Sequence, residues 1–140
     1  MNRSCHRDGG QASVLLVGVV LLGLAFTGLA VDGTRMFTAR RDLGALADAA
    51  ALAAASEIDV EAFRQSGGRE VRLDAGAARG VVAGILADSG LPAGTRVQVE
   101  VTTDRVDVGL ARPVGLTFLG VLGIGAQTIG AHAHASPNVG

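Results

Sequence analysis

Apolar positions along the chain follow three patterns in turn, and each pattern predicts a different kind of element. The first is continuous: residues 12–31, ASVLLVGVVLLGLAFTGLAV, are almost entirely apolar or small and carry no charge. At about 1.5 Å per residue a helix of this length covers the ~30 Å hydrocarbon core of a bilayer. We therefore expect a membrane-spanning helix over residues 12–31.

The second pattern is helical and amphipathic. Residues 36–56 are rich in Ala, and apolar positions recur every three or four residues, which predicts that the helix continues through residues 32–56 outside the membrane. Gly33 is the expected bend. Residues 57–73 lack a clear period and are expected to be a linker. Asp74 then predicts the N-cap of a second helix over residues 75–88.

The third pattern alternates with a period of two. Val97 to Val101 and Val106 to Leu110 each place apolar residues on one face, which predicts a β-hairpin. Arg112-Pro113 is expected to end the second strand, residues 114–122 to form a short apolar helix, and residues 128–135 to form a last strand. Residues 74–140 are thus expected to form a small α-β-β-α-β domain with a three-stranded antiparallel sheet, an α+β fold.

The apolar segment is open to a second interpretation. Gly28-Leu29-Ala30 resembles a signal-peptide cleavage site, and cleavage there would release a secreted soluble binding domain. The apolar run exceeds the ~7–15 residues of a signal peptide, and the helix continues beyond it. These features favour a retained single-pass anchor. Arg residues flank both ends of the apolar segment, so charge does not decide the orientation of the helix in the membrane. Residues 1–11 are expected to be the cytoplasmic flank.

Composition narrows the function classes. The formal net charge is −1 and aromatic residues are scarce, so nucleic acid is not an expected partner. The single cysteine, Cys5, has no partner for an internal disulfide, and no apolar run precedes it, so a lipid anchor is not expected either. No nucleophile motif or phosphate loop is present, which predicts no enzymatic activity, no cofactor and no small-molecule substrate. His132 and His134 share one strand face; a weak metal pair and a solvent-facing strand are the alternatives, and we favour the second.

A few residues are candidates for interaction. Arg40 and Arg41 suit anionic headgroups or a carboxylate on a partner, although an exposed helix face would look the same. Asp48 lies beside a stripe of Ala that offers little burial of its own, which suggests an interface that includes Ala50. Within the span, Gly23 and Thr27 form a small-xxx-small pair suited to helix packing. The full set of candidate interaction and packing residues is Asp32, Arg40, Arg41, Asp48, Ala50, Gly23 and Thr27.

Two runs carry a resemblance to a known family. The collar Gly28-Leu29-Ala30-Val31-Asp32 and the run LADAAALAAA at residues 46–55 resemble the N-terminal region of TadE/TadG-like proteins of tight-adherence (Flp) pilus assembly. The resemblance implies a pilin-like or pseudopilin-like protein of the cytoplasmic membrane, with its C-terminal domain outside the cytoplasm. It also implies that the partners are membrane lipid and other pilus or secretion-assembly subunits, met through the N-terminal helix.

The chain departs from the pilin-like members of this group at one position. Members cut by the prepilin peptidase carry Glu five residues after the cut, and a cut after Gly10 would place Leu15 there. We therefore expect no processing at Gly10. The resemblance then implies an anchor or side component, of the TadG-like type, and not the repeating unit of a filament.

Overall fold

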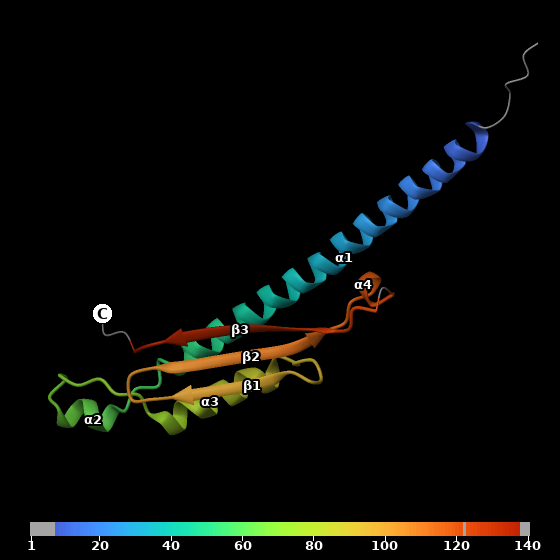
Figure 1. The fold of residues 1–140 in the computed structure, drawn as a ribbon. Coiled ribbons are helices and arrows are strands. Elements are labelled where there is room, and N and C mark those ends of the chain that lie inside the picture. The colour runs from blue at the N-terminus through green and yellow to red at the C-terminus, as the bar shows by residue number, and fades with distance from the viewer. Residues whose placement is uncertain (1–7, 122, 138–140) are drawn as a thin grey trace, which may run out of the picture.

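The computed structural model describes residues 8–121 and 123–137, so the expectations for Cys5 and most of the N-terminal flank lie outside the described residues. A single long helix, α1 (Asp8–Ala54), dominates the chain and runs along most of the molecule, with α2 beyond its C-terminal end (Figure 1). The expected bend at Gly33 is wrong: helix α1 continues through it. One glycine costs a helix only about 1 kcal/mol relative to Ala, and a long helical stretch lies on each side of this one.

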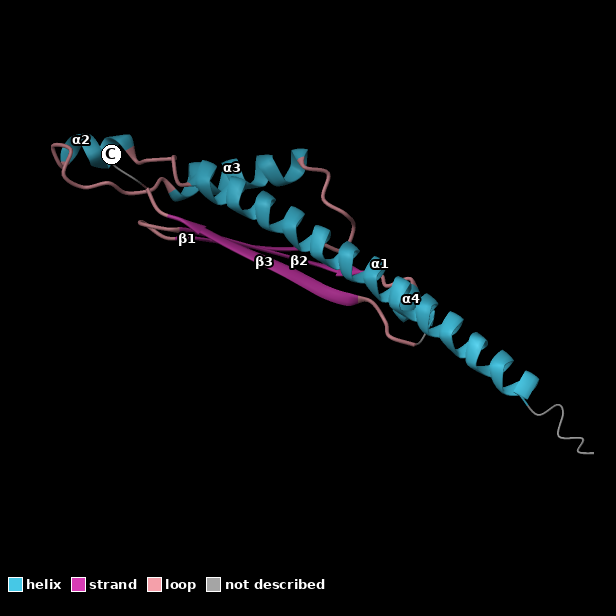
Figure 2. Ribbon diagram, turned by 90° about the horizontal axis from the view of Figure 1, so that it is seen from above, coloured by secondary structure: helices cyan, strands magenta, loops and turns pink. Residues whose placement is uncertain are grey.

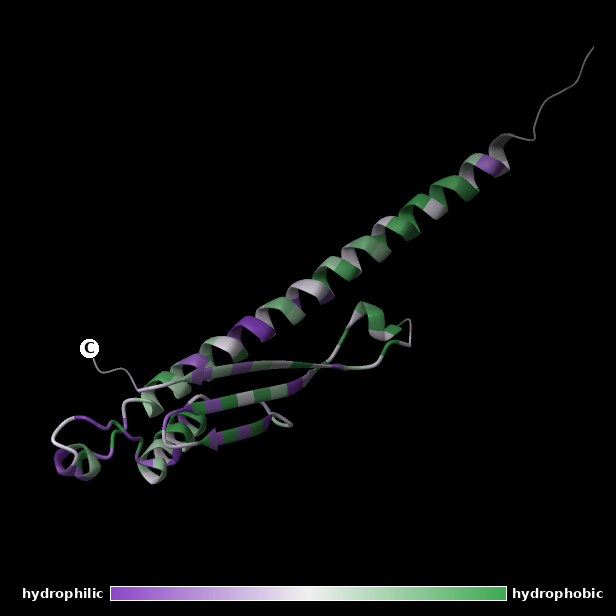
Figure 3. Cartoon of the chain, turned by 60° about the vertical axis from the view of Figure 1, so that its left-hand side comes forward, coloured by the Kyte–Doolittle hydropathy of each residue, from purple (hydrophilic) through white to green (hydrophobic). Residues whose placement is uncertain are grey.

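The two halves of α1 lie in different surroundings. Large side chains from Val14 to Val31 are exposed, and the helix is long and apolar enough to cross a membrane. Figure 3 shows this half as a nearly unbroken apolar rod that projects from the rest of the chain. The other half packs a face made mostly of Ala into the core: Ala39, Leu43, Ala47, Ala50, Ala51 and Ala54 are buried, as is Ala55 just past the end of the helix.

A three-stranded antiparallel sheet lies against the buried half of α1. Its strands are β1 (Arg96–Val101), β2 (Val106–Val114) and β3 (Gln127–Ala135), in the order β1-β2-β3. Figure 2 shows α1 and α3 (Ala75–Asp88) on the same face of this sheet. The inward side chains alternate along each strand, with Val106, Val108 and Leu110 at the centre. The α+β class and the three-stranded sheet are confirmed.

Helix α3 begins and ends where its residues predict. The Asp74 side chain accepts hydrogen bonds from the backbone N–H groups of Gly76 and Ala77, which satisfies donors that have no partner within the helix. Gly90, just past the end, has a positive φ of 60°, a conformation that glycine adopts without steric cost.

Three details differ from the sequence-based expectations. The segment expected to be a linker contains the short helix α2 (Val60–Gln65), capped by Asp59. Strand β2 does not end at Pro113, which pairs with Thr128 on β3. Since β1 pairs with β2 only up to Ala111, the proline lies where one flank of β2 is open, and there its missing N–H costs no ladder bond.

The third difference concerns the apolar helix expected over residues 114–122. In the structure its first residue, Val114, is still part of β2, and the helix, α4, spans only Phe118–Val121. Leu122 lies outside the described residues. Pairing with β3 competes with helix formation at the start of this segment, and the sheet prevails through Val114.

Candidate functional site

The junction between α1 and α4 is the most specific polar arrangement in the described part of the chain. Both carboxylate oxygens of Asp32 accept hydrogen bonds from the backbone at the start of α4: Oδ1 from Thr117 N–H at 2.9 Å, and Oδ2 from Phe118 and Leu119 at 2.9 and 2.8 Å. Asp32 is fully buried. An aspartate from the middle of α1 therefore caps a helix that lies 85 or more residues further along the chain.

The other end of α4 is closed by the chain itself. Gly123 N–H bonds to the carbonyl of Gly120, and Ile124 N–H bonds to the carbonyl of Leu119, each at 3.0 Å. With Gly123 at a positive φ of 83°, this is the hydrogen-bond pattern of a Schellman motif. Asp32 thus satisfies three backbone donors at the start of the short helix, and its own turn satisfies two carbonyls at its end.

A glycine on α1 allows α4 to lie this close. Gly28 is one helical turn before Asp32 and is buried. A Cβ at this position would lie 2.5–2.7 Å from three carbon atoms of the Phe118 side chain, which is far inside van der Waals contact. Gly28 and Asp32 therefore form one docking surface on α1, the glycine for the ring and the aspartate for the backbone.

An apolar depression continues from this docking surface toward the N-terminus of α1. Leu21, Leu24 and Leu29 line it from α1, and Phe118 and Val121 line it from α4. Helix α4 therefore lies alongside the uncharged segment of α1 (Figure 1), and not alongside the half of α1 that packs on the sheet.

The hydrogen bonds to Asp32 favour its ionised form. The N–H of Leu119 contributes most to lowering the pKa of Asp32 below its ordinary 3.8, with further lowering from Thr117, Phe118 and the nearby charge of Arg35. Removal of the carboxylate from water opposes these effects but does not overcome them. Arg35 also hydrogen-bonds the hydroxyl of Thr117, so two residues of α1 hold the start of α4.

The remaining sequence candidates are distributed over α1 and do not join this junction. Arg40, Arg41 and Asp48 are exposed. Among the described residues, one ion pair is formed, between Arg72 and Glu70. Asp48 therefore forms no ion pair with Arg40 or Arg41. Ala50 is completely buried in the chain's own core. The expectation that it faces a partner is therefore corrected: β2, β3 and α3 cover this face of α1.

The packing pair proposed within the apolar segment is exposed. Thr27 donates its hydroxyl proton to the carbonyl of Gly23 at 2.9 Å, one turn earlier in the same helix. No atom of another element lies within 4 Å of a Cβ built at Gly23. The glycine at a close helix contact is Gly28, which sequence reasoning assigned to a cleavage site. The contact of Gly28 with Phe118 has one indication in the sequence: Phe118 is an isolated aromatic residue in the apolar run after Pro113.

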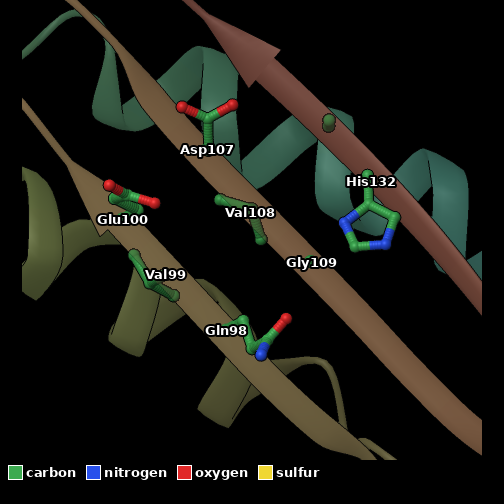
Figure 4. A pocket seen from close by; sticks show the side chains of 8 residues that line it. Gln98, Val99, Glu100, Asp107, Val108, Gly109 and His132 are labelled. Atoms are coloured by element: carbon green, nitrogen blue, oxygen red, sulfur yellow. The ribbon is translucent and has the colours of Figure 1, made fainter.

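The outer face of the sheet carries a second group of polar residues. Figure 4 shows Gln98 and His132 on either side of the bare backbone of Gly109, with Glu100 and Asp107 further along the same two strands. His132 lies over Gly109, where a Cβ would come within 2.9 Å of its Nδ1. His132 and His134 are both exposed on this face. The described residues contain no group of three or more His, Cys, Asp or Glu side chains placed to hold a metal ion.

Comparison with known proteins finds a match to one family model, over part of the chain. Residues 10–57 match the family model described as putative Flp pilus-assembly TadE/G-like, the family that the sequence resembles. The match covers almost all of α1, including Gly28 and Asp32, and stops before α2. No curated protein and no solved structure matches the chain.

Proposed function

We propose that this protein is a non-enzymatic, membrane-anchored component of Flp/Tad-type pilus or secretion-system assembly. Residues 12–31 of α1 form the anchor, and the α+β domain stands outside the cytoplasmic membrane. The family match over residues 10–57 supports the involvement in pilus assembly. A soluble domain released by cleavage near Ala30 would lose the part of α1 against which α4 packs, which makes the retained anchor the better account.

The division of α1 into two halves carries the proposal. Leu15, Leu22 and Phe26 leave more than half of their surface uncovered, at 69%, 57% and 63%. A water-soluble protein rarely exposes a continuous apolar surface of this extent. The same helix buries its Ala face against the sheet further along. One element is thus built for lipid at one end and for a protein core at the other.

We propose that the protein is pilin-like, with a rigid helix that joins a membrane anchor to a small domain; the continuity of α1 supports this. Because the anchor and the core share one unbroken helix, a lateral movement of the anchor in the bilayer moves the domain with it. Neighbouring subunits would meet through the exposed half of α1, where Gly23 and Thr27 leave the helix surface open. Arg40, Arg41 and Asp48 lie above the span, available to anionic lipid or to assembly partners.

Deletion and complementation test the assembly role. In a host that assembles Flp-type filaments, we expect loss of surface filaments when the gene is deleted, and recovery with the full chain. A matched chain in which a cleavable signal peptide replaces residues 1–31 exports the same domain without its anchor and should not restore filaments. Normal filaments in the deletion strain would contradict the role in assembly, and full rescue by the unanchored domain would contradict the anchoring.

The span also bears on the place of this protein in the assembly. Residues 12–31 contain no carboxylate, and a buried carboxylate is the group with which a pilin-like span could fix its register against a neighbour. We therefore propose an anchor or side component that remains uncut after Gly10. Mass spectrometry of the membrane-extracted protein tests this, since a mature N-terminus at Gln11 would contradict it.

A further inference from the structure

We propose that α4 and its turn form a second membrane contact, inserted among the headgroups and upper acyl chains of the outer leaflet beside α1. The contact surface, here called the α4 patch, consists of Phe118, Val121 and Ile124. The inference rests on the proposed anchoring of α1 and goes beyond it, because it assigns a lipid-binding role to a part of the folded domain.

The first observation is the position of α4 along α1. The residues of α1 that line the depression with α4 run from Leu21 to Leu29. At 1.5 Å per residue these positions lie roughly 3–15 Å below the outer end of the span at Val31. Amphipathic segments that lie in a bilayer surface are buried by about 5–10 Å, so α4 lies at the depth expected of an interfacial element.

The second observation is the exposure of the α4 patch. Val121 is 86% exposed, Phe118 44% and Ile124 43%. Large apolar side chains also line the adjoining surface of α1, where Leu21, Leu24 and Leu29 are more than half exposed. The patch is therefore continuous with the surface that the proposed function places in lipid.

The third observation is the lack of charge around the patch. From Pro113 to Ala131 the sequence contains no Asp, Glu, Lys or Arg. A segment of this length at the tip of a water-exposed domain usually carries charge, whereas a charged residue would be costly below the headgroups.

The fourth observation is the satisfied backbone of α4. Irregular backbone does not enter hydrocarbon with free N–H and C=O groups, because each unsatisfied group is costly there. Asp32 accepts the N–H groups of Thr117, Phe118 and Leu119, and the turn at Gly123 satisfies the carbonyls of Leu119 and Gly120. These five bonds lower the cost of moving the start and the turn of α4 out of water.

A bilayer fits these observations better than a second copy of the chain. A protein partner would cover the patch but would not require its depth to match the outer part of the span. A protein partner would also not explain why the run without charged residues, 113–131, extends on both sides of the turn at Gly123. Lipid accounts for the depth, the missing charge and the continuity with α1 together.

Depth-dependent fluorescence quenching in the full-length chain tests the inference. An environment-sensitive dye is attached to Val121→Cys in a Cys5→Ser background, in nanodiscs that contain lipids with quenchers on their acyl chains. Val17→Cys serves as the reference within the span, and Thr103→Cys, in the exposed turn between β1 and β2, serves as the reference in water. All three side chains are exposed, so labelling leaves the core intact.

We expect the dye at position 121 to show a blue-shifted emission and a loss of intensity with lipid quenchers close to that at position 17, with neither effect at position 103. Quenching at 17 but not at 121 would overturn the inference and leave the anchoring intact. A blue shift at 121 without lipid quenching would assign the patch to protein and would also overturn it. Absence of quenching at 17 would contradict the anchoring itself, and with it both proposals.

Discussion

Asp32 joins α1 to the start of α4, because its side chain accepts a hydrogen bond from the backbone of Thr117, 85 residues further along the chain. Its carboxylate replaces water for three N–H groups at the start of α4. A neutral side chain of similar size has one acceptor oxygen instead of two, so it cannot serve the same three donors. The capping of α4 therefore uses both the negative charge and the two oxygens of the Asp32 carboxylate.

The docking of α4 should therefore respond to acid. Since the pKa of Asp32 is lowered below 3.8 when α4 is docked, the carboxylate stays ionised and the contact persists at every pH above that value. As the pH falls through the lowered pKa, protonation removes acceptor capacity and α4 is released. In micelles, the amide proton shifts of Phe118 and Leu119 should stay constant from neutral pH to about pH 4 and change below it.

The matched variants for this titration are Asp32→Asn and Asp42→Asn. Asp42 is an exposed carboxylate on the same helix, so its loss should leave the acid transition of the two amides in place. Asp32→Asn should abolish the transition and give the released shifts at all pH values. The same acid transition in both variants would contradict the assignment of Asp32 as the cap.

Gly28 should be equally sensitive, for a steric reason. Gly28→Ala places a methyl group 2.5 Å from the Phe118 ring, so α4 must move away at a cost of about 1–3 kcal/mol. Exchange of the Phe118 and Leu119 amides should rise about 5- to 150-fold. Gly33→Ala, which has open space around the new methyl group, is the control. Equal exchange in the two variants would contradict the close contact at Gly28.

At the scale of elements, α1 connects two environments through the spacing of its small residues. The buried face at Ala47, Ala50 and Ala54 brings α1 close to the sheet, because Ala adds little width between a helix and a strand. The exposed face of the same turns carries Asp48 and Ala49. The Ala-rich run is thus an internal core face, with Asp48 on its outer side.

A pair of adjacent substitutions tests this assignment. Ala50→Glu buries an unpaired carboxylate in the core and should destabilise the domain by about 3–5 kcal/mol. Ala49→Glu, one position away on the exposed face, should change stability by less than about 0.5 kcal/mol. Hydrogen exchange of the central β2 amides measures both effects in the full chain. Equal protection in the two variants would show that Ala50 lies outside the core.

Local patterns predict the elements of this chain better than they predict its contacts. The Asp74 cap, the Gly90 stop and the alternation of valines fix α3 and the β-hairpin, because each is a short-range signal. The cap of α2 at Asp59 is also a local signal, but α2 spans only Val60–Gln65, too short for a clear apolar period. The docking of Phe118 on Gly28 and Asp32 depends on how the sheet returns the chain to α1. Residue spacing within α1 or within α4 does not predict that these two helices come into contact.

At the scale of the whole molecule, α1 divides the chain into an apolar rod and a folded domain, with α4 at the boundary (Figure 3). The sheet and α3 lie entirely to one side of this boundary. The position of α4 then becomes informative, because it marks the level at which the domain would meet a membrane surface. Both proposals require residues 12–31 to be embedded in the membrane, with the domain on its outer side.

Cysteine labelling in spheroplasts tests that claim most directly. The native Cys5 precedes the span, and Thr103→Cys in a Cys5→Ser background places one thiol in an exposed turn of the domain. We predict that a membrane-impermeant maleimide labels position 103 in intact spheroplasts and labels Cys5 only after lysis. Both proteins should remain in the membrane through carbonate extraction. Labelling of Cys5 from outside, protection of position 103, or release of the protein by carbonate would contradict that claim.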